Sequence, residues 1–241
     1  MKIGVITFPG TLEDDHAAHA VELAGAEQVK LWHKDTDLQG VDAVILPGGA
    51  THGNYLRPGA LAALSPIVEP LVAAAKEGLP ILGIGNGFQI LCEAGLLPGA
   101  FVSNSDGKYV CKDLKFKVEN NKTAWTSDYD EGAVVTLPLR TANGLFVVDD
   151  KTLAELESSG RVVLRYEDDV TGSANAIAGL ANEEGNVVGL MASADHAVEA
   201  GFGTPTPDGP HDGTDGPRCA QAAGRPARAR VTGAAGSPPA G

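Results

Sequence analysis

Short, continuous apolar segments that end in glycine or proline constrain the fold of this chain more than any other feature. Residues 2–8 form such a run, rich in β-branched side chains, and Pro9-Gly10 ends it. A strand that is hydrophobic along its whole length is typical of a parallel sheet covered by helices. Further strands of this kind are predicted over residues 28–32, 42–46 and 80–84. The sequence therefore predicts an α/β fold with a mostly parallel open sheet.

Helical periodicity separates several of these strands. Ala17, Ala20, Val21 and Ala24 recur at helical spacing, and Thr11 is expected to be the N-cap of this helix. Further helices are predicted over residues 66–76, 88–94 and 152–158. From residue 108 to 119 apolar and polar residues alternate, which indicates a half-exposed strand. Later strands are predicted over 133–137, 145–148, 161–166, 174–180 and 187–191. We expect a flavodoxin-like sheet with helices on both faces and antiparallel additions.

Composition excludes several classes of function. The formal net charge of -13 repels nucleic acid and anionic membranes, so neither is expected as a partner. No apolar run reaches the roughly 20 residues that span a bilayer, and the N-terminus lacks a signal-peptide pattern, so we expect a cytoplasmic protein. The three cysteines are far apart in sequence, and the pairs Asp15-His16 and Asp195-His196 lack metal-ligand spacing. Neither a metal nor a cofactor is predicted.

The chain changes character near residue 200. Residues 1–200 carry the α/β pattern, whereas Pro, Gly, Ala and Arg dominate residues 201–241. After Gly216 four arginines are the only charged residues. A segment with so few large apolar side chains cannot bury enough surface to fold alone, so a disordered tail is expected. If this tail replaces a covering helix, the apolar surface left exposed would favour a homo-oligomer.

Several segments, in order along residues 2–200, carry a family resemblance. They are Gly4–Thr11, Leu46–Gly49, Gly53–Arg57, Asn86–Ala94, Trp125–Tyr129 and Val188–Met191. Together they resemble the glutaminase subunit of phosphoribosylformylglycinamidine synthase, one of the glutamine amidotransferases that use a Cys-His-Glu triad. The resemblance implies the amidotransferase type of α/β fold and a site at the strand-turn-helix around residue 85.

The chain departs from that family at the expected site. Where the family has Gly-x-Cys-Asn-Gly, the cysteine position is Gly85, which offers no nucleophile. The histidine position is Ser193, which cannot act as a base toward a thiol, and the glutamate position is Asp195. Cys92 lies about two helical turns further on and is not expected to replace the missing thiol. The resemblance therefore implies that glutamine is not hydrolysed.

Other polar residues at motif positions are candidates for a different chemistry. His52, Ser193 and Asp195 are candidate catalytic groups, because they offer an imidazole, a hydroxyl and a carboxylate. The candidate substrate-binding residues are Gly49, Thr51, Asn86 and Gln89.

Three interpretations follow from the sequence. In the first, the pocket is repurposed for a different small polar metabolite. In the second, the protein is a non-catalytic pseudo-glutaminase that binds a large synthetase subunit, which the retained segment Gly53–Arg57 would suit. In the third, it is a subunit of phosphoribosylformylglycinamidine synthase by descent, in purine biosynthesis. Sequence motifs alone do not separate these alternatives.

Overall fold

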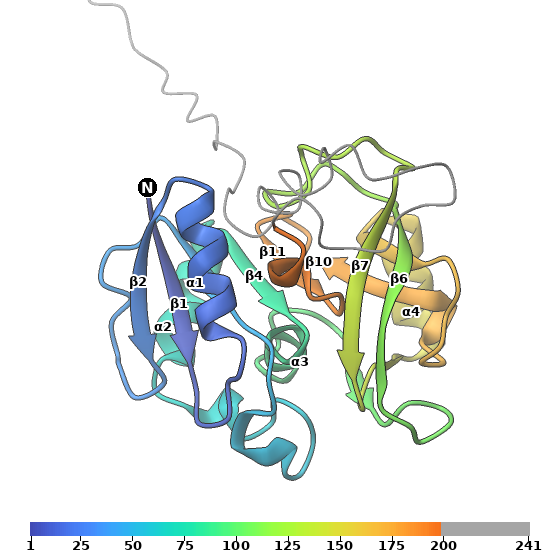
Figure 1. Cartoon of the computed structure of the whole chain (residues 1–241), viewed down its shortest axis with the longest axis horizontal. Coiled ribbons are helices and arrows are strands. Elements are labelled where there is room, and N and C mark those ends of the chain that lie inside the picture. The colour runs from blue at the N-terminus through green and yellow to red at the C-terminus, as the bar shows by residue number, and fades with distance from the viewer. Residues whose placement is uncertain (199–241) are drawn as a thin grey trace, which may run out of the picture.

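The computed structural model describes residues 1–198 and confirms the predicted α/β fold class (Figure 1). Its nine-stranded sheet has the order β2-β1-β3-β4-β11-β10-β9-β6-β7, and β5 and β8 form a separate pair. The strands are β1 (Lys2–Thr7), β2 (Glu27–Trp32), β3 (Ala43–Leu46), β4 (Ile81–Ile84), β5 (Ala100–Val102), β6 (Val110–Val118), β7 (Val134–Thr141), β8 (Leu145–Val147), β9 (Val162–Tyr166), β10 (Ile177–Ala181) and β11 (Val187–Leu190). The α-helices are α1 (Asp14–Leu23), α2 (Val68–Lys76), α3 (Asn86–Glu93) and α4 (Asp150–Ser158).

The sheet has a parallel half and an antiparallel half. All pairings from β2 through β1, β3 and β4 to β11 are parallel. All pairings from β11 through β10, β9 and β6 to β7 are antiparallel. Every residue of β3, β4 and β11 is buried, as the continuous apolar runs predict. The carboxyl ends of these three strands therefore meet at one edge of the sheet.

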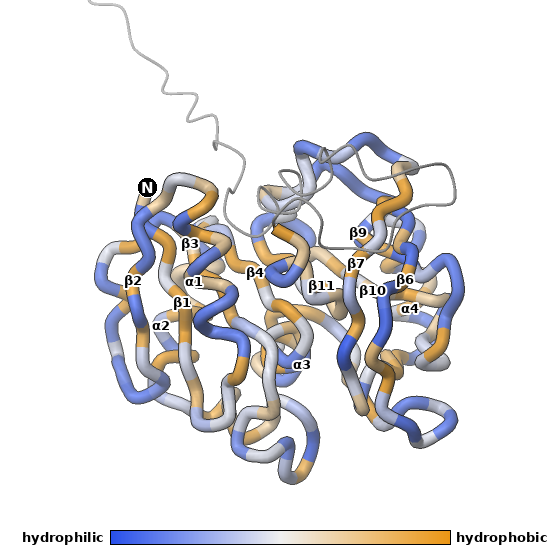
Figure 2. The backbone as a smooth tube through the Cα atoms, viewed as in Figure 1, coloured by the Kyte–Doolittle hydropathy of each residue, from blue (hydrophilic) through white to orange (hydrophobic). Residues whose placement is uncertain are grey.

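Helices cover both faces of the parallel half. In Figure 1, α1 crosses in front of the sheet and α2 lies behind it. The strands β1 and β4 are largely hydrophobic in Figure 2, whereas the outward side of α1 is hydrophilic. Ala17, Ala20 and Val21 form the buried stripe of α1, as the helical spacing predicts.

Some predicted boundaries were wrong. Thr11 is not the N-cap of α1, because it pairs with Gly49 as an isolated β-bridge, and its hydroxyl accepts a hydrogen bond from the Phe8 N–H at 2.9 Å. Glu13 occupies the N-cap position instead. The strand β5 was missed, since three residues are too short to show a pattern. It pairs with β8, which therefore lies outside the main sheet.

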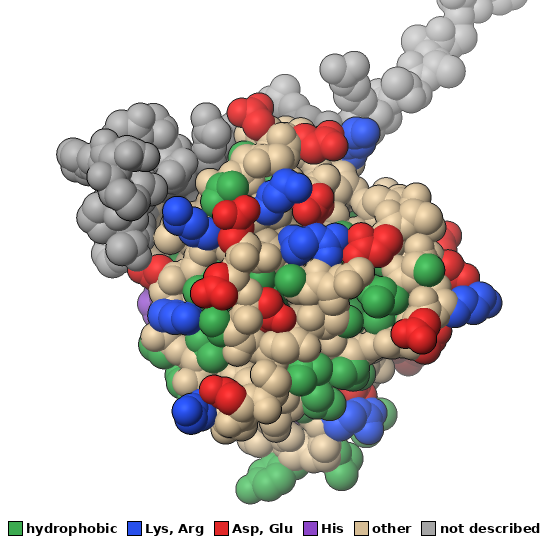
Figure 3. Space-filling view, turned by 90° about the vertical axis from the view of Figure 1, so that its right-hand side faces the viewer, with side chains coloured by type: hydrophobic (Ala, Val, Ile, Leu, Met, Phe, Trp, Pro, Cys, Tyr) green, Lys and Arg blue, Asp and Glu red, His purple; other side chains and the backbone are tan. Residues whose placement is uncertain are grey.

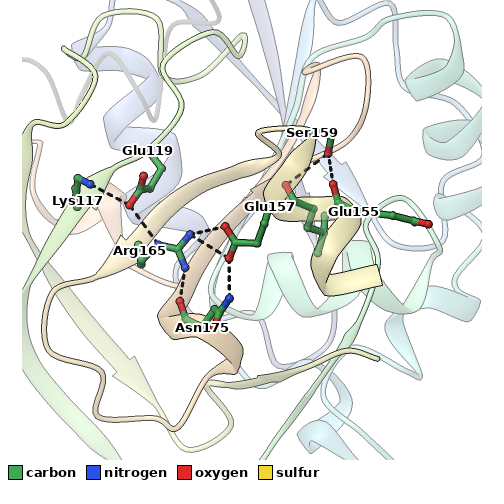
Figure 4. Close-up of polar contacts among 8 residues, drawn as sticks. Lys117, Glu119, Glu155, Glu157, Ser159, Arg165 and Asn175 are labelled. Carbon is green, nitrogen blue, oxygen red and sulfur yellow. Dashed lines mark hydrogen bonds and ion pairs between the residues drawn. The ribbon is translucent and has the colours of Figure 1, made fainter. Parts of the chain in front are cut away.

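Arg165 ties the antiparallel half of the sheet to α4 (Figure 4). From β9, its Nη2 donates to Glu157 Oε2 of α4 at 2.9 Å. Its Nε donates to Glu119 Oε1, just after β6, at 3.2 Å. Partly exposed ion pairs of this kind contribute at most about 1 kcal/mol each. They orient α4, and none of these three residues lines the cavity described below.

Helix α3 approaches the sheet so closely that two positions tolerate only glycine. A Cβ added at Gly87 would lie 1.9 Å from the Leu46 carbonyl oxygen of β3. A Cβ added at Gly189 of β11 would lie 2.1 Å from the ring of Phe88. Neither distance is compatible with van der Waals contact, so glycine sets the spacing between α3 and the strands beneath it.

None of the helices within residues 1–198 has the length and apolar character needed to cross a membrane. The predicted tail, residues 201–241, lies outside the described residues.

We predict that Gly87→Ala lowers the free energy of unfolding by about 3 kcal/mol, which is the upper end of the usual cost of adding a side chain to a packed core. This cost should exceed the gain from the higher helix propensity of alanine. The clash is with backbone, so a change of rotamer cannot relieve it. Gly78→Ala is the control, since its φ of +92° is strained for alanine but its Cβ meets nothing within 4 Å. It should cost only about 1 kcal/mol. Urea unfolding measures both variants, and equal losses would contradict the packing argument.

Candidate functional site

A cavity of about 220 Å³ opens where the carboxyl ends of the parallel strands meet. Gly48 and Gly49 after β3, Gly85 after β4 and Met191 after β11 contribute to its wall, and Arg140 of β7 closes one side. Ligands of open α/β sheets bind at this edge, so the position agrees with the sequence prediction. The cavity is the candidate functional site.

Gly85 forms a sharp elbow between β4 and α3. Its backbone has φ +55° and ψ −108°, and its N–H donates to the Leu190 carbonyl at 2.7 Å. The nearest atom to an added Cβ would be Gly48 Cα at 3.8 Å, so the position has room for a side chain. A strained strand-to-helix turn of this kind presents a nucleophile in other α/β enzymes. Here the elbow has the backbone shape of such a site but carries no side chain.

Asn86 and Gln89, two of the predicted substrate-binding residues, line the cavity and bond mainly to the protein itself. Asn86 Oδ1 accepts from the Thr51 N–H at 2.9 Å. Asn86 Nδ2 donates to Asn54 Oδ1 at 3.1 Å and to Gln89 Oε1 at 2.7 Å, and Gln89 Nε2 donates to the Asn143 carbonyl at 2.7 Å. Both donor hydrogens of the Asn86 amide are therefore used. These side chains hold the cavity wall in place rather than offering free donors to a ligand.

The structure separates the three candidate catalytic residues. Ser193 lines the cavity, and its N–H donates to the Pro138 carbonyl at 2.8 Å. Asp195 is not among the lining residues and is 1% exposed. His52 is also not among them, because the turn of residues 51–54 directs its ring toward His33, with the two ring centroids 5.7 Å apart. Gly49 lines the cavity, whereas Thr51 is buried beside it.

Asp195 is an unusual buried carboxylate. Neither of its side-chain oxygens has a hydrogen-bond partner among the described residues. Burial raises its pKa from the ordinary 3.8 to about 6, with His196 acting in the opposite direction. A proton is therefore bound to this group at mildly acidic pH.

A cluster of charged side chains beside the cavity joins distant parts of the chain. His16 Nδ1 lies 3.3 Å from Glu13 Oε2, and Arg140 Nη2 donates to the same oxygen at 3.1 Å. His196 Nε2 also contacts Glu13 Oε2, and the ring centroids of His16 and His196 lie 3.9 Å apart. The hydrogen bond with His196 holds the pKa of Glu13 below its ordinary value, against the effect of burial. Burial lowers the pKa of His16.

Sequence reasoning missed this cluster. The spacing of Glu13 and His16 places them one turn apart at the start of α1, which the sequence could have indicated. His196 is far away in sequence and arrives through a 3₁₀ turn, Ala194–His196, that packs near α1. No local pattern predicts that encounter.

Comparisons with known proteins identify the family across most of the chain, and they agree with the resemblance found in the sequence. The model of the CobB/CobQ-like glutamine amidotransferase domain matches residues 1–212. The phosphoribosylformylglycinamidine synthase subunit PurQ of Leifsonia xyli subsp. xyli is 52% identical over 217 residues, covering 90% of this chain and 94% of that protein. PurQ of Mycobacterium tuberculosis is 52% identical over 208 residues, covering 86% and 92%. The structure of PurLQS from Thermotoga maritima includes a chain that is 40% identical, with a TM-score of 0.80 and coverage of 92% and 96%.

Asp195 leads to a prediction about pH and stability. Because its pKa is higher in the folded protein than the ordinary 3.8, the native state keeps a proton that the unfolded chain releases between pH 4 and 6. The stability of the natural protein should therefore fall as pH rises through this window, by up to about 3 kcal/mol. Asparagine does not titrate, so the Asp195→Asn variant should not lose stability in this way. The free energy of unfolding of the variant minus that of the natural protein should therefore increase from pH 4 to pH 7.

Urea unfolding at several pH values, with a chelator present, measures the effect. Asp128→Asn, the same chemical change at an exposed position, is the control. A difference between Asp195→Asn and the natural protein that stays constant with pH would contradict the raised pKa.

Proposed function

Because the chain belongs to the CobB/CobQ-like glutamine amidotransferases and to the family of PurQ subunits, we propose that it is a subunit of phosphoribosylformylglycinamidine synthase that does not release ammonia from glutamine. One observation carries this proposal. Among the described residues that line the cavity there is neither a cysteine nor a histidine, although the elbow at Gly85 is formed. The scaffold of a glutaminase is present without its reactive side chains.

Glutamine hydrolysis by triad glutamine amidotransferases needs a thiolate and a base within hydrogen-bonding distance of each other. By the family resemblance, Gly85 and Ser193 stand at those two positions, and both line the same cavity. A serine hydroxyl is not a base at neutral pH, and glycine has no nucleophile. The surrounding backbone can still bind an amide or a carboxylate, because the first turn of α3 leaves N–H groups without intrahelical partners.

The two cysteines among the described residues do not supply the missing thiol. Cys92 is buried in α3, where burial raises its pKa and its Sγ donates to the Pro98 carbonyl. A buried, protonated thiol is a poor nucleophile. Cys111 is exposed on β6, opposite Arg140, and is not among the cavity-lining residues.

A surface beside the cavity supports binding to a large synthetase subunit. The segment between β3 and α2 lies at the lower end of the molecule in Figure 1, and some hydrophobic side chains reach the surface at that end in Figure 3. In that segment Tyr55, Leu56 and Leu64 are 73%, 81% and 80% exposed. Arg57 fixes the segment to α3 through a bidentate ion pair with Glu93, with N–O distances of 2.8 and 2.6 Å. An ordered apolar surface of this kind is typical of a protein interface.

A second candidate function is binding of a small polar metabolite without hydrolysis. The observation that favours it is the polar cavity wall, to which Arg140, Asn143 and Ser193 contribute. Arg140 could pair with an anionic group, since the cavity opens beside its guanidinium. A ligand of this class would raise the thermal midpoint of the purified protein.

We predict that the natural protein releases no ammonia from glutamine, alone or with its synthetase partner. The triple variant Gly85→Cys, Ser193→His, Asp195→Glu should gain activity, because the elbow has room for a side chain at residue 85. Omitting Ser193→His should lower the gained rate by roughly 100-fold or more, the usual contribution of a general base. Coupled detection of ammonia and glutamate measures these rates. Ammonia release by the natural protein would refute the proposal.

We further predict that Leu56→Asp weakens binding to the large synthetase subunit of the same organism by at least about tenfold, as expected for loss of a central apolar contact. Leu56 has φ +69°, a conformation that aspartate tolerates better than leucine, so the fold should persist. Leu23→Asp on α1 is the control, since Leu23 is also exposed but lies outside this surface. Surface-immobilised binding measures the affinities, and equal effects of the two variants would contradict the assignment.

A further inference from the structure

Three side chains beside the cavity are arranged as metal ligands. Glu13, His16 and His196 each offer one ligand atom, and these atoms all lie within 4.8 Å of one another. We propose that they bind a divalent transition-metal ion of the zinc type. Two imidazoles and one carboxylate are a common ligand set for such ions, with further coordination positions left open.

Glu13 and His16 have the spacing of two zinc ligands. His16 Nδ1 and Glu13 Oε2 lie 3.3 Å apart. Two ligands at the usual bond lengths of about 2.0–2.2 Å in a tetrahedral site lie roughly 3.4 Å from each other. His196 Nε2 contacts Glu13 Oε2 more closely than this, so its ring must move away from the carboxylate to admit the ion.

The backbone places the ligands before any ion binds. Glu13 and His16 share the first turn of α1, where the N–H of Glu13 donates to the Gly48 carbonyl at 3.3 Å. His196 is fixed by its own N–H, which donates to the Ser193 carbonyl at 3.1 Å. The side chains of Glu13 and His196 are only 17% and 15% exposed, whereas His16 is 52% exposed. Two ligands are thus shielded, and the third leaves a path from solvent.

The two contacts of His196 Nε2 cannot both be hydrogen bonds at the same time. His196 Nε2 contacts both Glu13 Oε2, which only accepts when ionised, and Arg140 Nη2, which only donates. One ring nitrogen can donate to the first or accept from the second, but it cannot do both. A metal ion would remove the conflict, because an unprotonated Nε2 and a carboxylate both act as ligands.

Arg140 competes with the ion for Glu13. Its Nη2 donates to Glu13 Oε2 at 3.1 Å, and the side chain is 33% exposed, so it can turn toward solvent. Glu13 and Arg140 both line the cavity, which places the open coordination positions next to it. The bound ion would therefore add a positive charge and a polarised water at the edge of the cavity.

Titration of the metal-stripped full chain with zinc, against a chromophoric chelator, tests the proposal. The protein carries Cys111→Ser and Cys219→Ser, which remove the exposed thiol on β6 and the cysteine of residues 201–241. We expect one zinc ion per chain. Cobalt in place of zinc should give visible d–d absorption without a thiolate charge-transfer band. Failure to compete with a micromolar chelator, or a thiolate band, would overturn the site.

Matched variants assign the ligands. Glu13→Gln and His16→Ala should each weaken zinc binding by at least about 100-fold. Loss of a residue that only supports a ligand costs up to about 100-fold, and loss of a ligand itself should cost more. His19→Ala is the control, because His19 is also on α1 but outside the cluster, and it should leave the affinity unchanged. Arg140→Gln should tighten binding, since it removes the competing cation. Circular dichroism in metal-free buffer checks that each variant is folded, and equal effects of His16→Ala and His19→Ala would refute the assignment.

Discussion

The close contact between α3 and the strands beneath it is the constraint on which the rest of the site depends. Gly87 and Gly189 allow the helix to approach β3 and β11 to a distance that any side chain would prevent. The elbow at Gly85 follows from this contact, since the chain must turn sharply from β4 into a helix lying so close. The same helix then presents Asn86 to the loop after β3, whose backbone and side chain it binds.

This arrangement explains how the cavity is held although none of its described lining residues is a cysteine or a histidine. The cavity wall is held by backbone packing and by hydrogen bonds among Asn86, Gln89 and the carbonyl of Asn143. None of these interactions needs a thiol or an imidazole inside the cavity. The scaffold therefore does not depend on a side chain at residue 85, which is consistent with the high similarity of the chain to PurQ subunits along most of its length.

The charged side chains beside the cavity interact more strongly than those on the surface. Glu13, Arg140 and His196 meet where water is partly excluded, so their mutual effects are stronger than those between exposed ion pairs such as Lys151 with Glu155. Asp195 lies deeper and has no hydrogen-bond partner among residues 1–198, which favours its protonated form. The edge of the cavity thus combines an apolar sheet with a small set of strongly coupled polar groups.

The sequence by itself determined the fold class, most strands and helices, the elbow and its lack of a nucleophile. These depend on local patterns: continuous apolar runs, helical spacing, and glycine at a turn. The boundary of α1 and the strand β5 could not be predicted, because Thr11 bonds to Phe8 and pairs with Gly49 instead of capping the helix, and three residues carry no periodicity. Only the tertiary structure decided that His52 faces His33 and that His196 meets Glu13, because contacts between distant segments depend on how the whole sheet and its loops pack.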